Sequence, residues 1–133
     1  WDFKLPTDAQ WEYACRAGTT TVYSTGDTIS SNDANFGTYL NAKAKNVGTY
    51  PPNNWGFYDM HGNIYEWTST YYPLHYDGSY TVDPQGPDSG VQAYIRGGSY
   101  KSHDKFLVAS NYRTHHYVDD RNYYGFRVSL QQN

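Results

Sequence analysis

Residues 59–67, with the sequence DMHGNIYEW, decide how the rest of this chain is interpreted. These nine residues combine two carboxylates, an amide, a glycine and two large aromatic side chains. Asp59 and Glu66, with Asn63 and main-chain carbonyls between them, offer the hard oxygen donors that bind calcium. Gly62 allows the backbone to turn tightly around an ion. Because the spacing is not that of the regular twelve-residue calcium loop, a polar turn that leads into a strand is the simpler alternative.

The composition indicates one loop-rich domain with an aromatic core. A chain of 133 residues has the length of a single domain. Its mean hydropathy is −0.88, so most of the apolar surface must come from 16 Tyr, 5 Phe and 4 Trp. Twelve Gly and six Pro interrupt the chain every few residues, which predicts short strands joined by ordered loops. The aromatic content and the small net charge argue against disorder.

Charge and cysteine usage narrow the classes of partner. The net charge is −3 and no basic run occurs, so we expect no nucleic-acid partner. No apolar run approaches 18 residues, so no membrane insertion is expected. Cys15 is the single cysteine and cannot form a disulfide within the chain. Because the sequence opens at Trp1 without a methionine, we expect it to be a fragment of a longer chain whose N-terminal part is missing, and its localisation is undetermined.

Residues 5–18 are predicted to contain the clearest helix. Thr7 is a favourable N-cap, and Gln10 three residues later completes a capping box. Gly18 is the expected stop at the C-terminal end. Cys15 falls on the apolar face of this helix, so we interpret it as a small core residue and not as a nucleophile.

Short strands are predicted in the remainder of the chain. The Gly97-Gly98 pair indicates a bulge or a close approach of two backbone segments. Alternation in the last apolar segment predicts one buried face formed by Phe126, Val128 and Leu130. The expected strands lie at residues 64–70, 94–96, 107–113 and 125–130.

Catalytic motifs are weak in this sequence. Ser102, His103 and Asp104 are neighbours in sequence, whereas the members of a catalytic triad converge from separate elements. The nucleophile elbow of hydrolases is absent. None of the five histidines has the spacing of a helical zinc pair, and no phosphate-binding glycine loop occurs.

A polar, aromatic segment at residues 99–124 is the best candidate for a binding surface. Ser, Tyr, His, Asp and Asn make up 16 of these 26 residues. Binding surfaces use this combination, because tyrosine supplies rigid contact area and the small polar groups supply adaptable hydrogen bonds. A merely hydrophilic loop is the alternative. The candidate ligand-contacting residues are Tyr100, Ser102, His103, Asp104, Asn111, Tyr112, His115, His116, Tyr117, Asn122, Tyr123 and Tyr124.

Four motifs in this order resemble the formylglycine-generating enzyme (sulfatase-modifying factor) family. They are LPTDAQWEYA at 5–14, GFYDMHGNIYEW at 56–67, RGGSY at 96–100 and GFR at 125–127. The resemblance implies an α+β fold of the C-type lectin-like kind, loop-rich, with short antiparallel strands and an N-terminal helix. It covers only the C-terminal half to two-thirds of a full-length member.

The resemblance also implies a structural calcium site in the opening stretch. Family members hold calcium there, and the matching ligands would be the side chains of Asp59 and Glu66 with the carbonyls of Gly62 and Ile64.

Oxidase chemistry does not follow from the resemblance. The family converts a substrate cysteine to formylglycine with two cysteines that bind copper, and the matching positions are Ser102 and Leu107. Thiolates are the soft ligands that Cu(I) needs, so no copper is expected and the chain resembles a non-catalytic member.

Other members of the family suggest what such a chain does. The variable proteins of diversity-generating retroelements carry ligand-contacting residues of this composition in their C-terminal part, although ordinary members are also rich in Asn and Tyr there. We therefore expect a domain that binds a protein or a glycan through residues 99–124. The resemblance to the variable proteins implies that the contact residues in this segment can differ among related genes. A formylglycine-generating oxidoreductase and a structural accessory domain are the alternatives.

Overall fold

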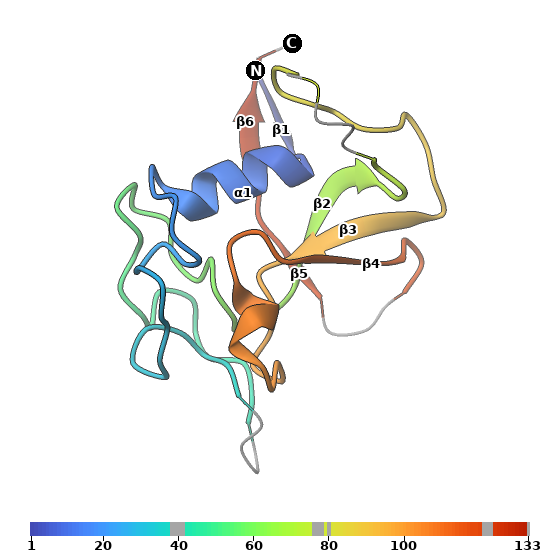
Figure 1. The fold of residues 1–133 in the computed structure, drawn as a ribbon. Coiled ribbons are helices and arrows are strands. Elements are labelled where there is room, and N and C mark those ends of the chain that lie inside the picture. The colour runs from blue at the N-terminus through green and yellow to red at the C-terminus, as the bar shows by residue number, and fades with distance from the viewer. Residues whose placement is uncertain (38–41, 76–78, 80, 121–123, 133) are drawn as a thin grey trace.

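The computed structural model describes residues 1–37, 42–75, 79, 81–120 and 124–132. Figure 1 shows a single longer helix beside a small sheet, with long loops forming much of the remainder. This arrangement confirms the predicted α+β, loop-rich architecture. The elements in chain order are β1 (Asp2–Lys4), α1 (Asp8–Arg16), β2 (Glu66–Tyr71), β3 (Gln92–Arg96), the 3-10 helix η1 (Lys105–Val108), β4 (Arg113–Tyr117), β5 (Gly125–Phe126) and β6 (Ser129–Gln131).

The strands form two separate sheets. The larger sheet has the order β4-β3-β2-β5, in which β3 is antiparallel to both neighbours and β5 runs parallel to β2. Its register places Glu66 opposite Arg96 and Gly125. The smaller sheet pairs β1 with β6 antiparallel, so the first and last segments of the chain lie together (Figure 1). The β2–β5 pair therefore departs from the expectation of antiparallel strands.

Helix α1 begins as its sequence predicts. The Thr7 side chain accepts from the Gln10 backbone N–H at 3.1 Å, and the Gln10 side chain accepts from the Thr7 N–H at 3.0 Å. The helix ends at Arg16 with Ala17 as its C-cap in a left-handed conformation at φ 47°, and Gly18 follows at the expected stop with φ 86°. Cys15 is fully buried, and burial raises its pKa to about 12, which confirms its role as a core residue.

The two glycines after β3 permit the predicted close approach of two backbone segments. Gly98 has a φ of +70°, and a Cβ there would lie 2.5 Å from the Leu107 carbonyl oxygen and 2.6 Å from Cγ1 of Val108. Only a residue without a side chain allows η1 to pack against this turn.

Residues 107–113 do not form the predicted strand. Asp104 caps η1 by accepting the Phe106 N–H at 2.9 Å, so residues 105–108 turn helically, and β4 begins only at Arg113. A capping carboxylate at the start of the segment outweighed the strand preference of its apolar residues.

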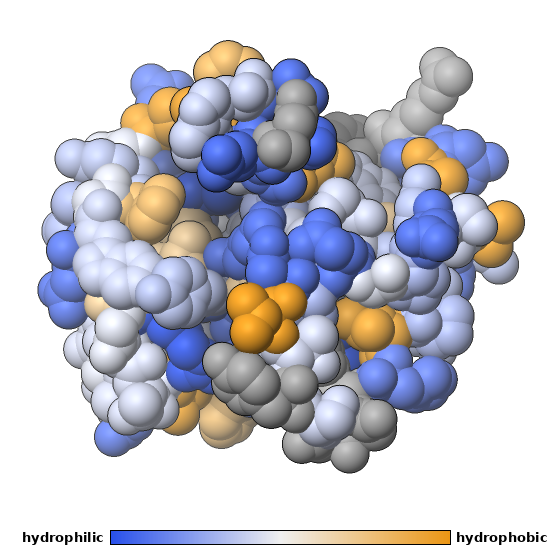
Figure 2. Space-filling model, turned by 90° about the horizontal axis from the view of Figure 1, so that it is seen from above, coloured by the Kyte–Doolittle hydropathy of each residue, from blue (hydrophilic) through white to orange (hydrophobic). Residues whose placement is uncertain are grey.

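The predicted buried face at the end of the chain is also wrong. Phe126, Val128 and Leu130 are 69%, 55% and 55% exposed. The segment divides between β5 in one sheet and β6 in the other, so no layer covers the alternate side chains. Figure 2 shows a surface in which hydrophilic side chains predominate and hydrophobic ones form small separate patches.

Two clusters of packed side chains contribute to the described core. One joins Trp11 and Cys15 of α1 to Met60. The other joins Tyr23 to Val108 and Ala109, with Tyr112 packed against them among others. None of the described helices has the length and apolar character to cross a bilayer.

Candidate functional site

A chain of ion pairs connects α1 to the larger sheet, and we call it the charge ladder. It consists of Arg113, Asp8, Arg96, Glu12 and Arg16, in that order. Asp8 binds Arg113 Nη1 at 2.9 Å through one oxygen and Arg96 Nε at 2.5 Å through the other. Glu12 then binds Arg96 Nη2 at 3.0 Å and Arg16 Nε at 2.9 Å. The ladder ties the first helix to β3 and β4.

The centre of the charge ladder is buried and its ends are partly exposed. The side chains of Asp8 and Arg96 are 1% and 2% exposed, against 28% for Arg16. Burial alone would lower the pKa of Arg96, but the hydrogen bond and charge of Asp8, followed by those of Glu12, raise it. Arg96 therefore has a scaffold role, because its removal would take one of the arginine partners from the buried Asp8 carboxylate.

A cavity of about 600 Å³ lies where the two ends of the charge ladder reach the surface. We call it the ladder cavity. It brings Asn111 and Tyr112, two of the predicted ligand-contacting residues, together with the terminal arginines of the ladder. Its full lining is Arg16, Thr20, Thr21, Val22, Phe106, Ala109, Asn111, Tyr112 and Arg113.

Strand β4 divides the other predicted residues between two aromatic groups. The ring of His115 stacks on Tyr72 with centroids 3.7 Å apart. The next residue, His116, packs instead against Tyr124 at 4.9 Å and lies 3.2 Å from Asp120. Successive side chains point to opposite faces of a strand, so the two histidines do not share one surface.

Some of the predicted contact residues have structural roles. Ser102 is only 4% exposed, and its Oγ accepts the Ser99 N–H at 2.9 Å. Asp104 caps η1, as described above. Ser102 therefore differs from the expectation of a surface position, since its hydroxyl closes a buried turn.

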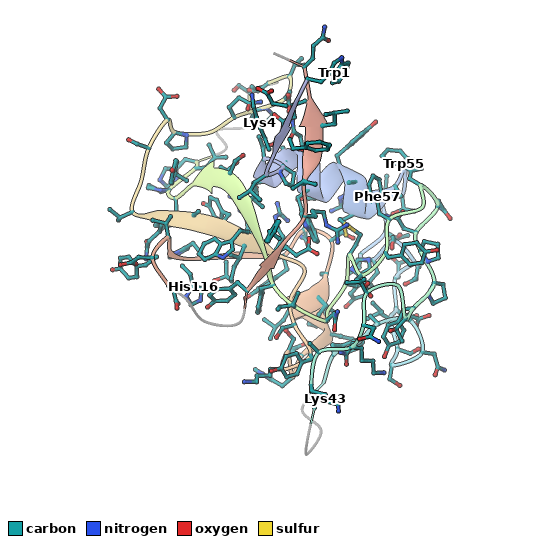
Figure 3. The ribbon with its side chains drawn as sticks, turned by 180° about the vertical axis from the view of Figure 1, so that it is seen from behind. Trp1, Lys4, Lys43, Trp55, Phe57 and His116 are labelled. Atoms are coloured by element: carbon teal, nitrogen blue, oxygen red, sulfur yellow. The ribbon has the colours of Figure 1, made fainter. Side chains whose placement is uncertain are left out.

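The remaining predicted residues are more accessible. His103 and Asn111 are exposed, and Tyr117 is 58% exposed. Tyr100 is half-buried, with the Lys101 ammonium over its ring. Asn122 and Tyr123 lie outside the described residues. Figure 3 places His116 on the opposite side of the molecule from Trp55 and Phe57, whereas Asn111 and Tyr112 line the ladder cavity together with the loop that follows α1.

The positions that match the family's copper ligands carry no ligand for a soft metal. Ser102 is the buried hydroxyl just described. Leu107 belongs to η1, and its N–H donates to the Asp104 carbonyl at 3.0 Å. Tyr65 lies beside Ser102, and burial raises the pKa of this tyrosine to about 12, so its phenol stays protonated.

The predicted calcium ligands lie around a second cavity, of about 620 Å³. Asp59, Ile64 and Glu66 line it together with Arg127. Glu66 Oε2 accepts from Trp11 Nε1 at 2.7 Å and from Arg127 Nε at 2.5 Å, while Oε1 accepts from Arg127 Nη2 at 2.7 Å. The guanidinium thus holds both oxygens of one proposed ligand.

The carboxylates of Asp59 and Glu66 supply oxygen atoms, the ligands that calcium prefers, but they are the only two predicted ligands with charged side chains. Glu66 Oε1 accepts one hydrogen bond and has capacity for a second contact. Asp59 uses Oδ2 to accept the Gly48 N–H at 2.7 Å. Gly62 is not among the lining residues, and its carbonyl accepts the Ile64 N–H at 2.9 Å. Within the described part of the chain, no three His, Cys, Asp or Glu residues gather, so calcium would depend on two carboxylates and stays a prediction.

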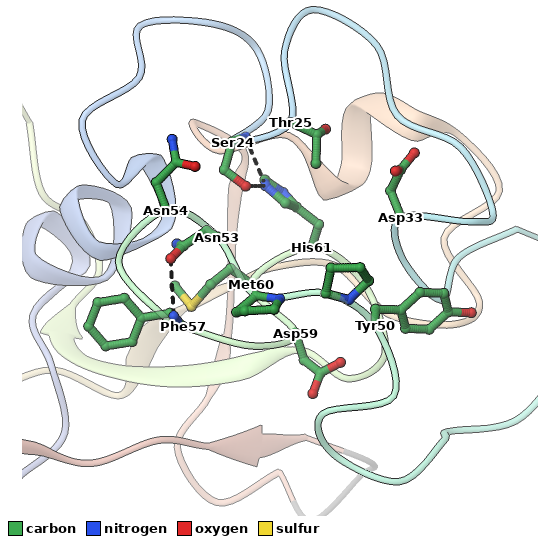
Figure 4. Close-up of a pocket in the computed structure, with 12 residues that line it drawn as sticks. Ser24, Thr25, Asp33, Tyr50, Asn53, Asn54, Phe57, Asp59, Met60 and His61 are labelled. Carbon is green, nitrogen blue, oxygen red and sulfur yellow. Dashed lines mark hydrogen bonds between the residues drawn. The ribbon is translucent and has the colours of Figure 1, made fainter.

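A third cavity, of about 450 Å³, contains a histidine whose role the sequence did not reveal (Figure 4). His61 Nε2 lies 3.1 Å from the Ser24 backbone N and 2.9 Å from its Oγ, while Nδ1 lies 2.7 Å from the Val108 carbonyl. Burial lowers the pKa of His61, so the ring is neutral at pH 7. Because a backbone N–H occupies the basic nitrogen, the ring fastens two loops together and is not available to activate Ser24.

Comparisons with known proteins agree with this architecture. The family described as Sulfatase-modifying factor enzyme 1-like domain matches residues 2–132. The chain is 36% identical over 134 residues to a protein named serine/threonine-protein kinase pkn1 from Chlamydia pneumoniae, covering 98% of this chain and 21% of that protein. It is 32% identical over 117 residues to the formylglycine-generating enzyme of Mus musculus, covering 77% of this chain and 32% of the enzyme.

Solved structures show the same fold. Treponema denticola variable protein 1 superimposes with a TM-score of 0.85 at 32% identity, over 95% of this chain and 46% of that one. PvdO from Pseudomonas aeruginosa superimposes with a TM-score of 0.79 at 29% identity, over 95% and 51%. The chain therefore spans between 21% and 51% of the length of the relatives named here.

Proposed function

We propose, since the chain belongs to the family of sulfatase-modifying factor enzyme 1-like domains, that it is a non-catalytic member that binds a ligand. The observation that carries the proposal is the contrast between a scaffold held by the buried ion pairs of the charge ladder and an accessible surface of Tyr, Asn and His side chains next to it. The two positions where the family's oxidase binds copper hold a buried hydroxyl at Ser102 and an alkyl group at Leu107.

The binding surface consists of the exposed members of residues 99–124. Tyr117 presents more than half of its surface, and Asn111 is exposed at the rim of the ladder cavity. Tyrosine and asparagine at such positions make contacts without being needed for packing. Aromatic side chains near the centre of an interface supply most of its affinity, so Tyr117 is the expected anchor on the β4 side.

The ligand is a protein or a glycan. The net charge of −3 and the lack of a basic run in the sequence disfavour nucleic acid. The likeness to Treponema denticola variable protein 1 supports a member in which the contact residues vary while the fold stays constant. In that case residues 103, 111 and 117 would differ among sister genes, and residues of the charge ladder would not.

Pull-down of partners on the immobilised chain tests the proposal. Tyr117→Ala and Asn111→Ala should abolish or strongly reduce capture while leaving the folding transition unchanged. Tyr13→Ala is the matched control, because Tyr13 is 70% exposed, contacts Trp55 and is not among the predicted contact residues. Equal capture by all three variants would refute the assigned surface.

The alternative of a formylglycine-generating oxidoreductase makes an opposite prediction. It requires copper-dependent consumption of oxygen in the presence of a cysteine-containing peptide. We expect no consumption above that of a matched sample without protein, because a hydroxyl and an alkyl group are poor ligands for Cu(I). The other alternative, a structural accessory domain, predicts that no ligand is captured by any variant.

A further inference from the structure

The ladder cavity has a chemical character that the proposed function does not by itself specify. Two arginines line it, and none of the described residues that line it is acidic. The protein as a whole is negative, so this concentration of positive charge is local. We propose that the ladder cavity is the anchoring subsite of the binding surface and that it takes an acidic side chain of a protein ligand, an inference that rests on the proposed function.

The charge ladder places positively charged side chains at the cavity. The five side chains of the charge ladder contribute three guanidinium groups against two carboxylates. Arg16 shares the Glu12 carboxylate with Arg96, so this one carboxylate pairs with two guanidinium groups. A ligand carboxylate, which is a monoanion at neutral pH, would supply a further negative charge at the Arg16 end of the ladder.

Arg16 is the last residue of the charge ladder and lines the cavity. Its Nε binds Glu12 and its Nη1 donates to the Thr21 carbonyl at 3.0 Å. These two bonds fix the plane of the guanidinium. Among the described residues, none accepts a hydrogen bond from Nη2. A guanidinium that is already oriented loses little conformational freedom when it binds a carboxylate, which favours a charge-assisted hydrogen bond.

The walls of the cavity combine apolar and hydrogen-bonding side chains. Phe106 is 59% exposed and Val22 is 36% exposed, so an apolar surface lies beside the arginine. Asn111 and Tyr112 supply hydrogen-bonding groups on the same cavity. The combination suits a carboxylate followed by an aromatic residue in a peptide segment, because the ring can cover Phe106 while the carboxylate meets Arg16.

A pair of matched peptides tests this inference on the intact chain. The probes are acetyl-glutamyl-phenylalanine amide and its neutral isostere acetyl-glutaminyl-phenylalanine amide, titrated while NMR signals of the backbone and of the arginine Nε–H groups are followed. We expect saturating shifts at Arg16, Asn111 and Tyr112 with the glutamyl peptide. The glutaminyl peptide should bind at least about tenfold more weakly, the loss typical of a charge-assisted hydrogen bond.

Two variants locate the binding. Arg16→Gln should weaken the glutamyl peptide about tenfold and remove its preference over the glutaminyl peptide. Phe106→Ala keeps the ladder intact and should weaken both peptides alike, which makes the test independent of the folding of the arginine variant. Lys43→Gln, at an exposed lysine outside the cavity, is the control and should bind as the unaltered chain does.

Three results would overturn the inference. Equal binding of the two peptides would remove the carboxylate from the interaction. Shifts that cluster outside the ladder cavity would remove the site. Saturating shifts with methyl glucuronide but none with the glutamyl peptide would replace the protein source with a glycan.

The failure of this inference is distinguishable from the failure of the proposed function. If Tyr117→Ala abolishes capture of a partner and the glutamyl peptide does not bind, only the anchoring subsite is refuted. If the glutamyl peptide binds as expected but no partner is captured, the carboxylate subsite is supported and the proposed function is refuted.

Discussion

The charge ladder and the surface at residues 99–124 use polar side chains in opposite ways. In the ladder, Asp8 and Arg96 are buried and each makes more than one charged contact. On the surface, His103, Asn111 and Tyr117 are open to solvent. Asp8, Glu12 and Arg96 of the ladder lie within the motifs shared with the family, whereas His103, Asn111 and Tyr117, on which the proposed function rests, lie outside those motifs.

The largest expected effect comes from breaking the scaffold at its centre. Arg96→Met removes the guanidinium that pairs with Asp8 and Glu12, so the buried Asp8 carboxylate keeps Arg113 but loses its buried arginine partner. We expect a loss of about 3–5 kcal/mol in the free energy of unfolding, measured by urea denaturation.

The matched control for this substitution is Lys43→Met. Lys43 is exposed, and the same change of side chain there should alter the free energy by less than about 0.5 kcal/mol. Similar losses in both variants would show that the ladder does not stabilise the fold.

A second test compares two glycines that both have positive φ. Gly98→Ala places a methyl group against the Leu107 carbonyl and Val108, whereas Gly56→Ala meets no atom within 4 Å. Both changes carry a backbone cost of about 1 kcal/mol. We expect Gly98→Ala to cost a further 1–3 kcal/mol or so, about the cost of overpacking.

The thermal midpoints of the two glycine variants give the readout. If Gly56→Ala lowers the midpoint as much as Gly98→Ala does, close packing of η1 on the turn at residues 97–98 contributes nothing.

A third test addresses the predicted calcium site within the scaffold. Calcium at about a hundred times its Kd adds about 2.7 kcal/mol to the folded state, so the melting temperature should rise by several degrees and fall again with a chelator. Asp59→Asn should abolish this response while Glu66 keeps its contacts with Trp11 and Arg127. A melting temperature that calcium and chelator leave unmoved would show that Arg127 alone serves as the cation for Glu66.

The smallest effect on stability is expected on the surface itself. Tyr117→Ala removes a side chain that is 58% exposed at the end of β4. The free energy of unfolding should change by less than about 0.5 kcal/mol, while capture of a partner is lost. A loss of several kcal/mol would instead place Tyr117 in the scaffold.

Local signals made part of the fold predictable from the sequence. The cap formed by Thr7 and Gln10, and the close approach permitted by Gly98, depend on residues near one another in sequence. The charge ladder was beyond such reasoning, because Asp8 and Arg96 are separated by 88 positions. The exposure of Phe126 and Leu130 was equally hidden, since it depends on which sheet each strand joins.

The candidate site was likewise only partly predictable from the sequence. Composition identified residues 99–124 as a region of interest, but it could not separate the buried Ser102 from the exposed Asn111. The ladder cavity was missed because Arg16 belongs to the first helix. Glu12 and Arg16 have the four-residue spacing of a helical ion pair, and this spacing gives no sign of the cavity beside them.

A saturation scan with protease resistance as the readout of folding tests the central contrast most directly. A surface-displayed library of the chain would carry every substitution at Asp8, Gly98, Arg96, Asn111 and Tyr117. We predict that nearly all substitutions at the first three positions abolish resistance, whereas nearly all at Asn111 and Tyr117 preserve it and leave the surface free to evolve toward a ligand. Intolerance at Asn111 and Tyr117 equal to that at Arg96 would contradict the division between scaffold and binding surface.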